Sequence, residues 1–399
     1  MRIAVFHNLP SGGAKRALYG LVKYLTMLGC VVDVFVPSTA DETFLPLSQL
    51  LDNVKVYQVK KTLRGLVKSA TRYIVPASTQ GVFLADLEET QRIIAAVINR
   101  SDCDVAFIEQ DRYTISPYIL RYIAKPHVYY CPQPRRSEEI LRRLSVSAGN
   151  TTLLRRVWRW YVIPRLEIID KENASCAKWI LTNSYFSREA ILRAYGMNSY
   201  VSYLGVDTGL FRPSTISRSP FVLSVGALIP AKGYDFIIRA LSLIDENVRP
   251  RLIIVSNKVW KPYEDFLKRL AAERRVLLEV RVLIDDLHLV ELYREAALCV
   301  YAPYLEPFGL VPLEAMACGT PVVAVKEGGI RESVVHGYGG LLSERDEKEF
   351  AEAVSWLLLD KETHQRMSRD AVEAIRSFWT LEHAARRLLR HLERVIQDS

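Results

Sequence analysis

The sequence predicts an α/β fold class in which parallel sheets are covered by helices. Apolar runs of four to eight residues alternate with amphipathic helical patterns almost from end to end, which is the pattern of parallel strands joined by helices. A cluster of turn residues, Leu204-Gly-Val-Asp-Thr-Gly-Leu-Phe-Arg-Pro213, interrupts this alternation once. Because 399 residues correspond to two or three domains of roughly 150 residues each, we predict two doubly wound parallel-sheet domains.

The first series of elements begins with a short strand, a glycine-containing turn and a helix. The helix carries apolar residues at helical spacing from Leu18 to Leu28 and is expected to end at Gly29. Gly12 and Gly13 lie in the turn before it, where glycines allow a tight turn and let an anion approach the helix amides. Most Gly-Gly pairs only form a turn, and this one fits neither a dinucleotide fingerprint nor a Walker A loop. Strands are predicted at Arg2–Phe6, Val31–Val36, Val54–Val59, Val105–Ile108, His127–Cys131 and Trp179–Thr182.

A second series follows the cluster of turn residues. The cluster predicts a domain boundary between residues 205 and 206, and the series after it predicts a second domain over residues 206–380 and a final helix over residues 381–399. Strands of the second domain are predicted at Phe221–Val225, Leu252–Val255, Val276–Leu283, Leu298–Ala302 and Val322–Val325.

The stretch from Glu306 to Ala324 says most about function. It predicts a loop, a helix with Pro312 and Glu314 in its first turn, a stop at Gly319 and a buried strand. Two carboxylates are then expected beside the free backbone amides of residues 308–310, and such amides form a natural anion site. A capped helix with two incidental acids is the simpler interpretation.

The same stretch, Glu306-Pro-Phe-Gly-Leu-Val-Pro-Leu-Glu314-Ala-Met-Ala-Cys-Gly-Thr-Pro-Val-Val-Ala, resembles the donor-site signature of retaining glycosyltransferases of family 4. His7-Asn-Leu-Pro-Ser-Gly-Gly-Ala-Lys-Arg16 resembles the loop that faces the donor diphosphate in that family, and Gly205-Val-Asp-Thr-Gly-Leu-Phe-Arg-Pro213 resembles its interdomain hinge. The resemblance implies a GT-B fold, in which two Rossmann-like domains face each other across a cleft. It also implies that the final helix packs back on the first domain.

The resemblance also implies roles for individual residues. Lys232 is expected to neutralise the leaving diphosphate, and Glu306 to hold the donor sugar and stabilise positive charge on its ring; both are the implied catalytic residues. Glu314 is expected to accept hydrogen bonds from the ribose hydroxyls. Further donor contacts are implied for the loop glycines and for three backbone amides, namely Gly12, Gly13, Phe308, Gly309 and Leu310.

Two positions depart from the family pattern. Ala227 stands where many members have an arginine that contacts the diphosphate, and Pro132 stands where many have a histidine. Gln133, Arg135 and Arg136, which follow Pro132, are the candidate residues for binding the acceptor.

The expected reaction needs no cofactor and no metal. The donor is expected to be a UDP- or GDP-hexose, and the acceptor a saccharide or a lipid-linked glycan intermediate. Asp102-Cys-Asp104 spells a metal motif of a different transferase fold, but it precedes an apolar strand and is interpreted as a structural turn. Asp285 is likewise interpreted as a helix N-cap.

The positive charge is concentrated in the first half of the chain. The formal net charge is +8, and residues 1–205 hold 27 Lys and Arg against 17 Asp and Glu. Residues 60–75 and 155–161 combine cations with aromatic or apolar side chains, as segments at an anionic membrane surface do, although helices packed on a core show the same composition. Nucleic acid is not an expected partner because no recognition module accompanies the charge.

Cysteine usage favours a cytoplasmic protein, and the two basic segments leave open a peripheral position on the inner face of a membrane. The six cysteines are scattered, and no run of about 18 uncharged apolar residues occurs. The resemblance to family 4 implies a retaining, metal-independent hexosyltransferase of glycan or polysaccharide biosynthesis. Two alternatives stay open: another enzyme of the same fold, such as a nucleotide-sugar epimerase, and a non-catalytic protein that binds sugars or polyanions.

Overall fold

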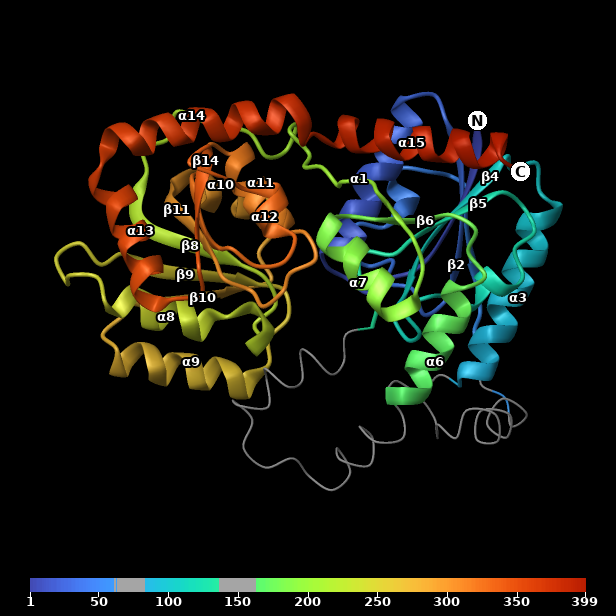
Figure 1. The fold of residues 1–399 in the computed structure, drawn as a ribbon, viewed down its shortest axis with the longest axis horizontal. Helices are drawn as coiled ribbons and strands as arrows, with labels where there is room; N and C mark the ends of the chain where they lie inside the picture. The colour runs from blue at the N-terminus through green and yellow to red at the C-terminus, as the bar shows by residue number, and fades with distance from the viewer. Residues whose placement is uncertain (61, 63–82, 136–162) are drawn as a thin grey trace, which may run out of the picture. The chain divides into compact units, whose positions relative to one another are not determined.

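The computed structural model describes residues 1–60, 62, 83–135 and 163–399. The chain divides into two compact units (Figure 1). The first unit consists of Met1–Tyr203 and Ala384–Ser399, and the second of Leu204–His383. The sequence placed these divisions at 205/206 and 380/381, so each differs by two or three residues.

The first unit is built on a seven-stranded sheet in the order β3-β2-β1-β4-β5-β6-β7, and all neighbouring strands run parallel. Strand β1 is central, and its residues 3–6 are completely buried because helices cover both faces of a parallel sheet. In chain order the strands and helices are β1 (Arg2–Asn8), α1 (Gly13–Met27), β2 (Val31–Pro37), β3 (Val54–Tyr57), α3 (Leu84–Arg100), β4 (Val105–Asp111), β5 (His127–Tyr130), α6 (Ile163–Ala174), β6 (Ile180–Thr182), α7 (Tyr185–Tyr195), β7 (Tyr200–Val201) and α15 (Leu381–Gln397).

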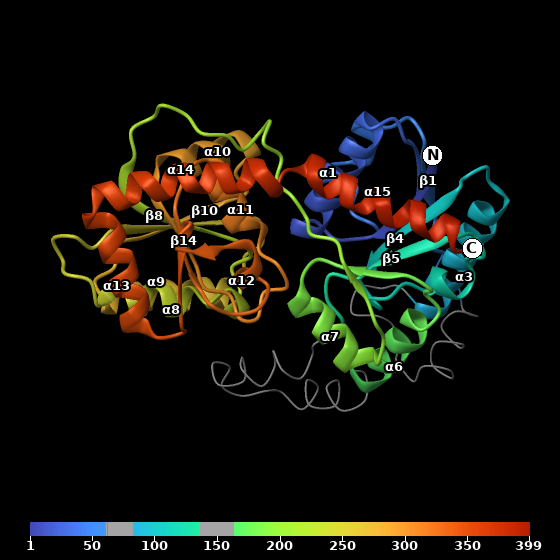
Figure 2. The same ribbon diagram turned by 45° about the horizontal axis from the view of Figure 1, so that its top comes forward.

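The C-terminal helix α15 completes the first unit (Figure 2). Its buried face includes Leu388 and Leu392. His391 lies against the rings of Trp179 and Tyr200, which stack on each other with centroids 4.4 Å apart. The last helix therefore packs at the β6–β7 side of the first sheet.

The second unit is built on a second parallel sheet, in the order β10-β9-β8-β11-β12-β14-β13. Helices α8, α9 and α13 pack together in one group, and α10, α11 and α14 in another (Figure 1). In chain order the elements are β8 (Ser219–Val225), α8 (Tyr234–Ser242), β9 (Arg251–Ser256), α9 (Lys261–Glu273), β10 (Leu278–Val282), α10 (Asp286–Glu295), β11 (Ala296–Tyr301), α11 (Leu310–Ala317), β12 (Val322–Val325), α12 (Ile330–Ser333), β13 (Val335–His336), β14 (Gly339–Ser343), α13 (Glu347–Leu359) and α14 (Lys361–Phe378).

All eleven strands that the sequence predicted are present, with ends that differ by at most three residues. The prediction missed β7, β13 and β14. Two of these have only two residues, and β14 begins with Gly339-Gly340, so none shows the apolar run that identifies a buried strand. In the described part of the chain, no helix is long and apolar enough to cross a membrane.

Candidate active site

Lys232 and Glu306 form an ion pair at one edge of the second sheet. The Lys232 Nζ and Glu306 Oε2 atoms are 2.7 Å apart, and the two side chains are 21% and 23% exposed. Lys232 ends a 3-10 turn (Pro230–Lys232) after β8, and Glu306 lies in the loop after β11. Because β8 and β11 are parallel neighbours, their carboxyl ends bring the two loops together.

Close backbone approach fixes the lysine turn against the glutamate loop. Gly233 has a φ of +66°, and a Cβ atom there would lie 2.1 Å from the Ala302 carbonyl oxygen. The Tyr304 amide also donates to the carbonyl of Ala231, with an N–O distance of 2.9 Å. Only glycine allows both the left-handed backbone and this approach at residue 233.

The glutamate loop itself has an unfavourable backbone conformation. Leu305, the residue before Glu306, has a φ of +49°, which costs about 1–2 kcal/mol for a residue with a Cβ atom. The Glu306 carbonyl accepts from the Gly329 amide at 2.8 Å. A Cβ atom at Gly328 would lie 2.3 Å from the same carbonyl oxygen, so this double-glycine turn packs directly behind Glu306.

Helix α11 begins at Leu310, with Gly309 as its N-cap at a φ of +96°. The first amides of a helix have no acceptor within it, so the geometry is compatible with an anion at this end, and the anion site itself stays a prediction. Phe308 contributes backbone only, because its side chain is buried against Trp379, with ring centroids 5.7 Å apart. Pro312 lies in the first turn, as predicted, and Gly319 follows the helix at a φ of +76°.

The prediction that Glu314 lies in the first turn of α11 is wrong. The helix starts at Leu310, so Glu314 is its fifth residue and belongs to the second turn. Its Oε2 atom accepts a hydrogen bond of 2.8 Å from the Tyr293 hydroxyl, and its side chain is buried. Burial, and then the Glu314 carboxylate, raise the pKa of Tyr293 well above its ordinary value. The two carboxylates thus have separate protein partners, Lys232 for Glu306 and Tyr293 for Glu314.

The predicted residues of the first unit lie at the carboxyl ends of its strands. Gly12 precedes α1 at a φ of +135°, and its carbonyl accepts from the Arg16 amide at 3.0 Å. Gly13 is the first residue of α1, and a Cβ atom at Gly12 would meet no atom within 4 Å. The left-handed backbone alone therefore requires glycine at residue 12.

The sequence analysis did not identify a buried cluster of charged residues next to this turn. The side chains of His7 and Lys15 are completely buried, and both contact the Glu42 carboxylate. The Lys15 Nζ and His7 Nε2 atoms are 3.2 Å apart. The donors of His7 and Lys15 oppose the effect of burial and lower the pKa of Glu42 to about 2. The three residues come from β1, α1 and a loop, and only their proximity in the fold relates them.

The predicted acceptor residues are only partly described. The Gln133 carbonyl accepts from the Gln110 side chain at 2.6 Å, and the Arg135 Nη2 atom donates to the Tyr113 carbonyl at 2.7 Å. Arg136 lies outside the described residues, as do residues 155–161 and most of residues 60–75.

The acidic residues interpreted as structural have structural partners. Asp104 accepts from the Arg2 amide at 2.6 Å, and Asp285 is the N-cap of α10, where it accepts from the His288 amide at 2.9 Å. The N-cap prediction is confirmed. Over the ranges that the structure describes, no group of three or more His, Cys, Asp and Glu side chains is placed to hold a metal ion.

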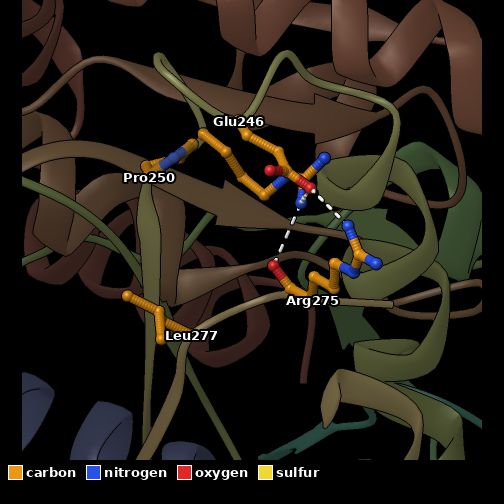
Figure 3. Close-up of a pocket in the computed structure, with 5 residues that line it drawn as sticks. Glu246, Pro250, Arg275 and Leu277 are labelled. Carbon is orange, nitrogen blue, oxygen red and sulfur yellow. Dashed lines mark hydrogen bonds and ion pairs between the residues drawn. The ribbon is translucent and has the colours of Figure 1, made fainter. Parts of the chain in front are cut away.

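A separate pocket of about 230 Å³ lies at the opposite edge of the second sheet (Figure 3). Its lining comes from the segments that precede β9 and β10, whereas Lys232 and Glu306 lie beyond the carboxyl ends of β8 and β11. Arg275 and Glu246 face each other there, with Nη1 and Oε1 3.4 Å apart. This pocket therefore has no part in the ion-paired site.

Comparison with known sequences relates the second unit to a family. Residues 209–374 match the model of the family "glycosyl transferases group 1". The D-inositol 3-phosphate glycosyltransferase of Corynebacterium glutamicum is 36% identical over 167 residues, which are 39% of this chain and 39% of that protein. The enzyme of the same name from Acidothermus cellulolyticus is 32% identical over 242 residues, 54% of this chain and 53% of that protein. The chain thus spans about half or less of the length of these curated relatives.

Comparison with solved structures extends the likeness of fold to the whole chain. HepE of Anabaena, in complex with UDP and glucose, has a TM-score of 0.73 at 19% identity over 99% of this chain and 100% of that one. The sucrose-phosphate synthase of Thermosynechococcus elongatus also has a TM-score of 0.73, at 18% identity over 100% of both chains. The predicted two-domain α/β fold of the GT-B class is confirmed.

Proposed function

Because residues 209–374 carry a domain of the glycosyl transferases group 1, we propose that this protein is a retaining, metal-independent glycosyltransferase. The donor is a UDP- or GDP-hexose, and the acceptor is a saccharide or a lipid-linked intermediate of glycan biosynthesis. HepE, the structural neighbour, is in complex with UDP and glucose, which favours UDP as the first donor to test.

The observation that carries the proposal is the ion pair between Lys232 and Glu306. Breaking the bond between an anomeric carbon and a diphosphate creates negative charge on the phosphate and positive charge on the sugar ring. A cation and a carboxylate 2.7 Å apart can stabilise these two developing charges at adjacent points. The amides at the start of α11 add further donors for the diphosphate or the sugar.

The proposed reaction proceeds on one face of the sugar. The bond between the anomeric carbon and the diphosphate oxygen breaks, and that oxygen keeps the electron pair and receives stabilisation from Lys232. The acceptor hydroxyl then attacks the anomeric carbon from the same side and gives its proton to the departing phosphate oxygen. Glu306 stabilises the oxocarbenium-like ring without forming a bond to it, and Glu314 holds the ribose. Proton NMR of the product tests this course, and an inverted anomeric configuration would exclude it.

Calorimetry with UDP- and GDP-hexoses, without added metal, tests the donor site. A charge-assisted hydrogen bond contributes about 1.5–3 kcal/mol, so Lys232→Ala and Glu314→Ala should each weaken binding by roughly 10- to 100-fold. Lys268→Ala is the matched control, because Lys268 pairs with Glu264 at 2.6 Å on the exposed side of α9 in the same unit. It should bind as the wild type does.

The same titration separates the alternatives. Glu306→Gln should still bind the nucleotide but transfer sugar far more slowly, at a residual rate that can still be measured. Conversion of the donor without any acceptor would indicate an epimerase, because a transferase alone only hydrolyses its donor slowly. Failure of every nucleotide sugar to bind would favour the non-catalytic binding protein, with Ala227 in place of the missing arginine as the reason.

A further inference from the structure

Each of the five residues from Ala302 to Glu306 makes a backbone hydrogen bond to another part of the second unit. The Ala302 and Pro303 carbonyls accept from Arg345, at 3.0 and 2.7 Å. The Tyr304 amide donates to a carbonyl of the lysine turn, and the Glu306 carbonyl accepts from an amide of the double-glycine turn. The remaining residue of the five, Leu305, donates its amide to the Glu327 carboxylate at 3.4 Å. Two side chains, those of Arg345 and Glu327, thus supply three of the five contacts.

Arg345 and Glu327 also bind each other through two hydrogen bonds along one edge of the guanidinium group. The Nε–Oε1 distance is 2.6 Å and the Nη2–Oε2 distance is 3.0 Å, with side chains 16% and 18% exposed. The guanidinium carbon lies 3.9 Å from the centroid of the Tyr304 ring. Only the planar guanidinium provides two parallel hydrogen bonds, two carbonyl contacts and a stacking surface at once, so lysine cannot replace it.

We propose that Arg345, acting together with Glu327, is a positioning residue that holds the loop of residues 302–305 so that Glu306 meets Lys232. Arg345 follows β14 and precedes α13, and Glu327 follows β12. The pair therefore joins the carboxyl ends of β12 and β14 to the loop that follows β11. Leu305 in the left-handed region needs such support, because a strained conformation persists only where its surroundings determine it. The inference rests on the proposed function for its consequence in catalysis, but its structural part can be tested alone.

The structural part is tested by amide hydrogen exchange of the peptide that contains Tyr304 and Leu305. Arg345→Lys and Glu327→Gln should each raise its exchange rate at least tenfold. Arg239→Lys is the control, since Arg239 pairs with Asp235 at 3.0 Å on α8 and does not belong to this loop. Equal exchange in all four proteins would overturn the inference, whether or not the protein transfers sugar.

The catalytic part is tested by a double-mutant cycle with Glu306→Gln. Arg345→Lys should lower kcat at least tenfold while the melting temperature stays close to that of the Arg239→Lys control. Arg345→Lys added to Glu306→Gln should cost nothing further, because the arginine acts through the glutamate. Losses that multiply would overturn positioning and leave only a structural role. A wild-type protein without any transfer would instead disprove the proposed function, and the exchange experiment would still decide the loop contacts.

Discussion

Replacement of Glu42 by Gln should destabilise the first unit strongly. Glu42 is the carboxylate that both Lys15 and His7 contact, and the side chains of these two bases are completely buried. A fall of its pKa from 4.5 to about 2 corresponds to about 3 kcal/mol, at 1.36 kcal/mol per pKa unit. Removal of one partner of a buried ion pair generally costs about 3–5 kcal/mol, which agrees with the value obtained from the pKa of Glu42.

The effect should depend on pH with a defined sign. Because the pKa of Glu42 is lower in the folded state, its contribution is fully present above pH 4.5 and is lost as pH falls towards 2. Burial also lowers the pKa of His7, and the Glu42 carboxylate opposes this effect, so protonation of His7 should destabilise the variant more than the wild type. The difference between the two proteins therefore reports on Glu42 together with His7, and it should vanish near pH 2.

Hydrogen exchange of peptides from β1 and α1 measures this free energy within the first unit. At pH 7 a loss of about 3 kcal/mol accelerates exchange roughly 100-fold. Glu89→Gln is the control, because Glu89 pairs with Arg92 where both side chains are more than half exposed, and such pairs contribute at most about 1 kcal/mol. If the two variants exchange equally, or if the difference survives at pH 2, the cluster does not hold α1 as described.

Two further substitutions test the second unit. Gly233→Ala places a Cβ atom 2.1 Å from the Ala302 carbonyl oxygen in a left-handed conformation. It should therefore lower the free energy of unfolding of that unit by at least about 1–3 kcal/mol and weaken donor binding. A urea unfolding curve equal to that of the wild type would contradict this. Tyr293→Phe removes the hydroxyl that donates to Glu314 and should lower the free energy of unfolding by about 1–3 kcal/mol. If Glu314 belongs to the donor site, calorimetry should also show a loss of nucleotide affinity in this variant.

The strands were predictable because their signal is local. A buried parallel strand is a continuous apolar run, and strands β1, β9, β11 and β12 show it. Asp285 was predictable for the same reason, since an N-cap is a relation between residues three apart. The two-residue strands and the glycine-led β14 have no such signal, and their pairing comes only from the strands beside them.

The candidate site was predictable in its members and not in its contacts. The resemblance selected Lys232 and Glu306, but the two are 74 residues apart, and only the order of β8 and β11 in the sheet shows that they can pair. Glu314 was misplaced because Pro312 suggested a later helix start than Leu310. Arg345 and Glu327 belong to no motif that we recognised, because what relates them is a loop that both contact.

The division of the chain has a consequence for the order of events on the ribosome. The second unit is continuous, from Leu204 to His383, whereas the first needs residues 384–399 to bury Leu388 and Leu392. The segments at the two ends of the second unit lie side by side, since Val206 and Thr380 pair in a parallel bridge. The second unit can therefore finish folding before the first, because the residues of α15 that complete the first unit are translated after the whole of the second.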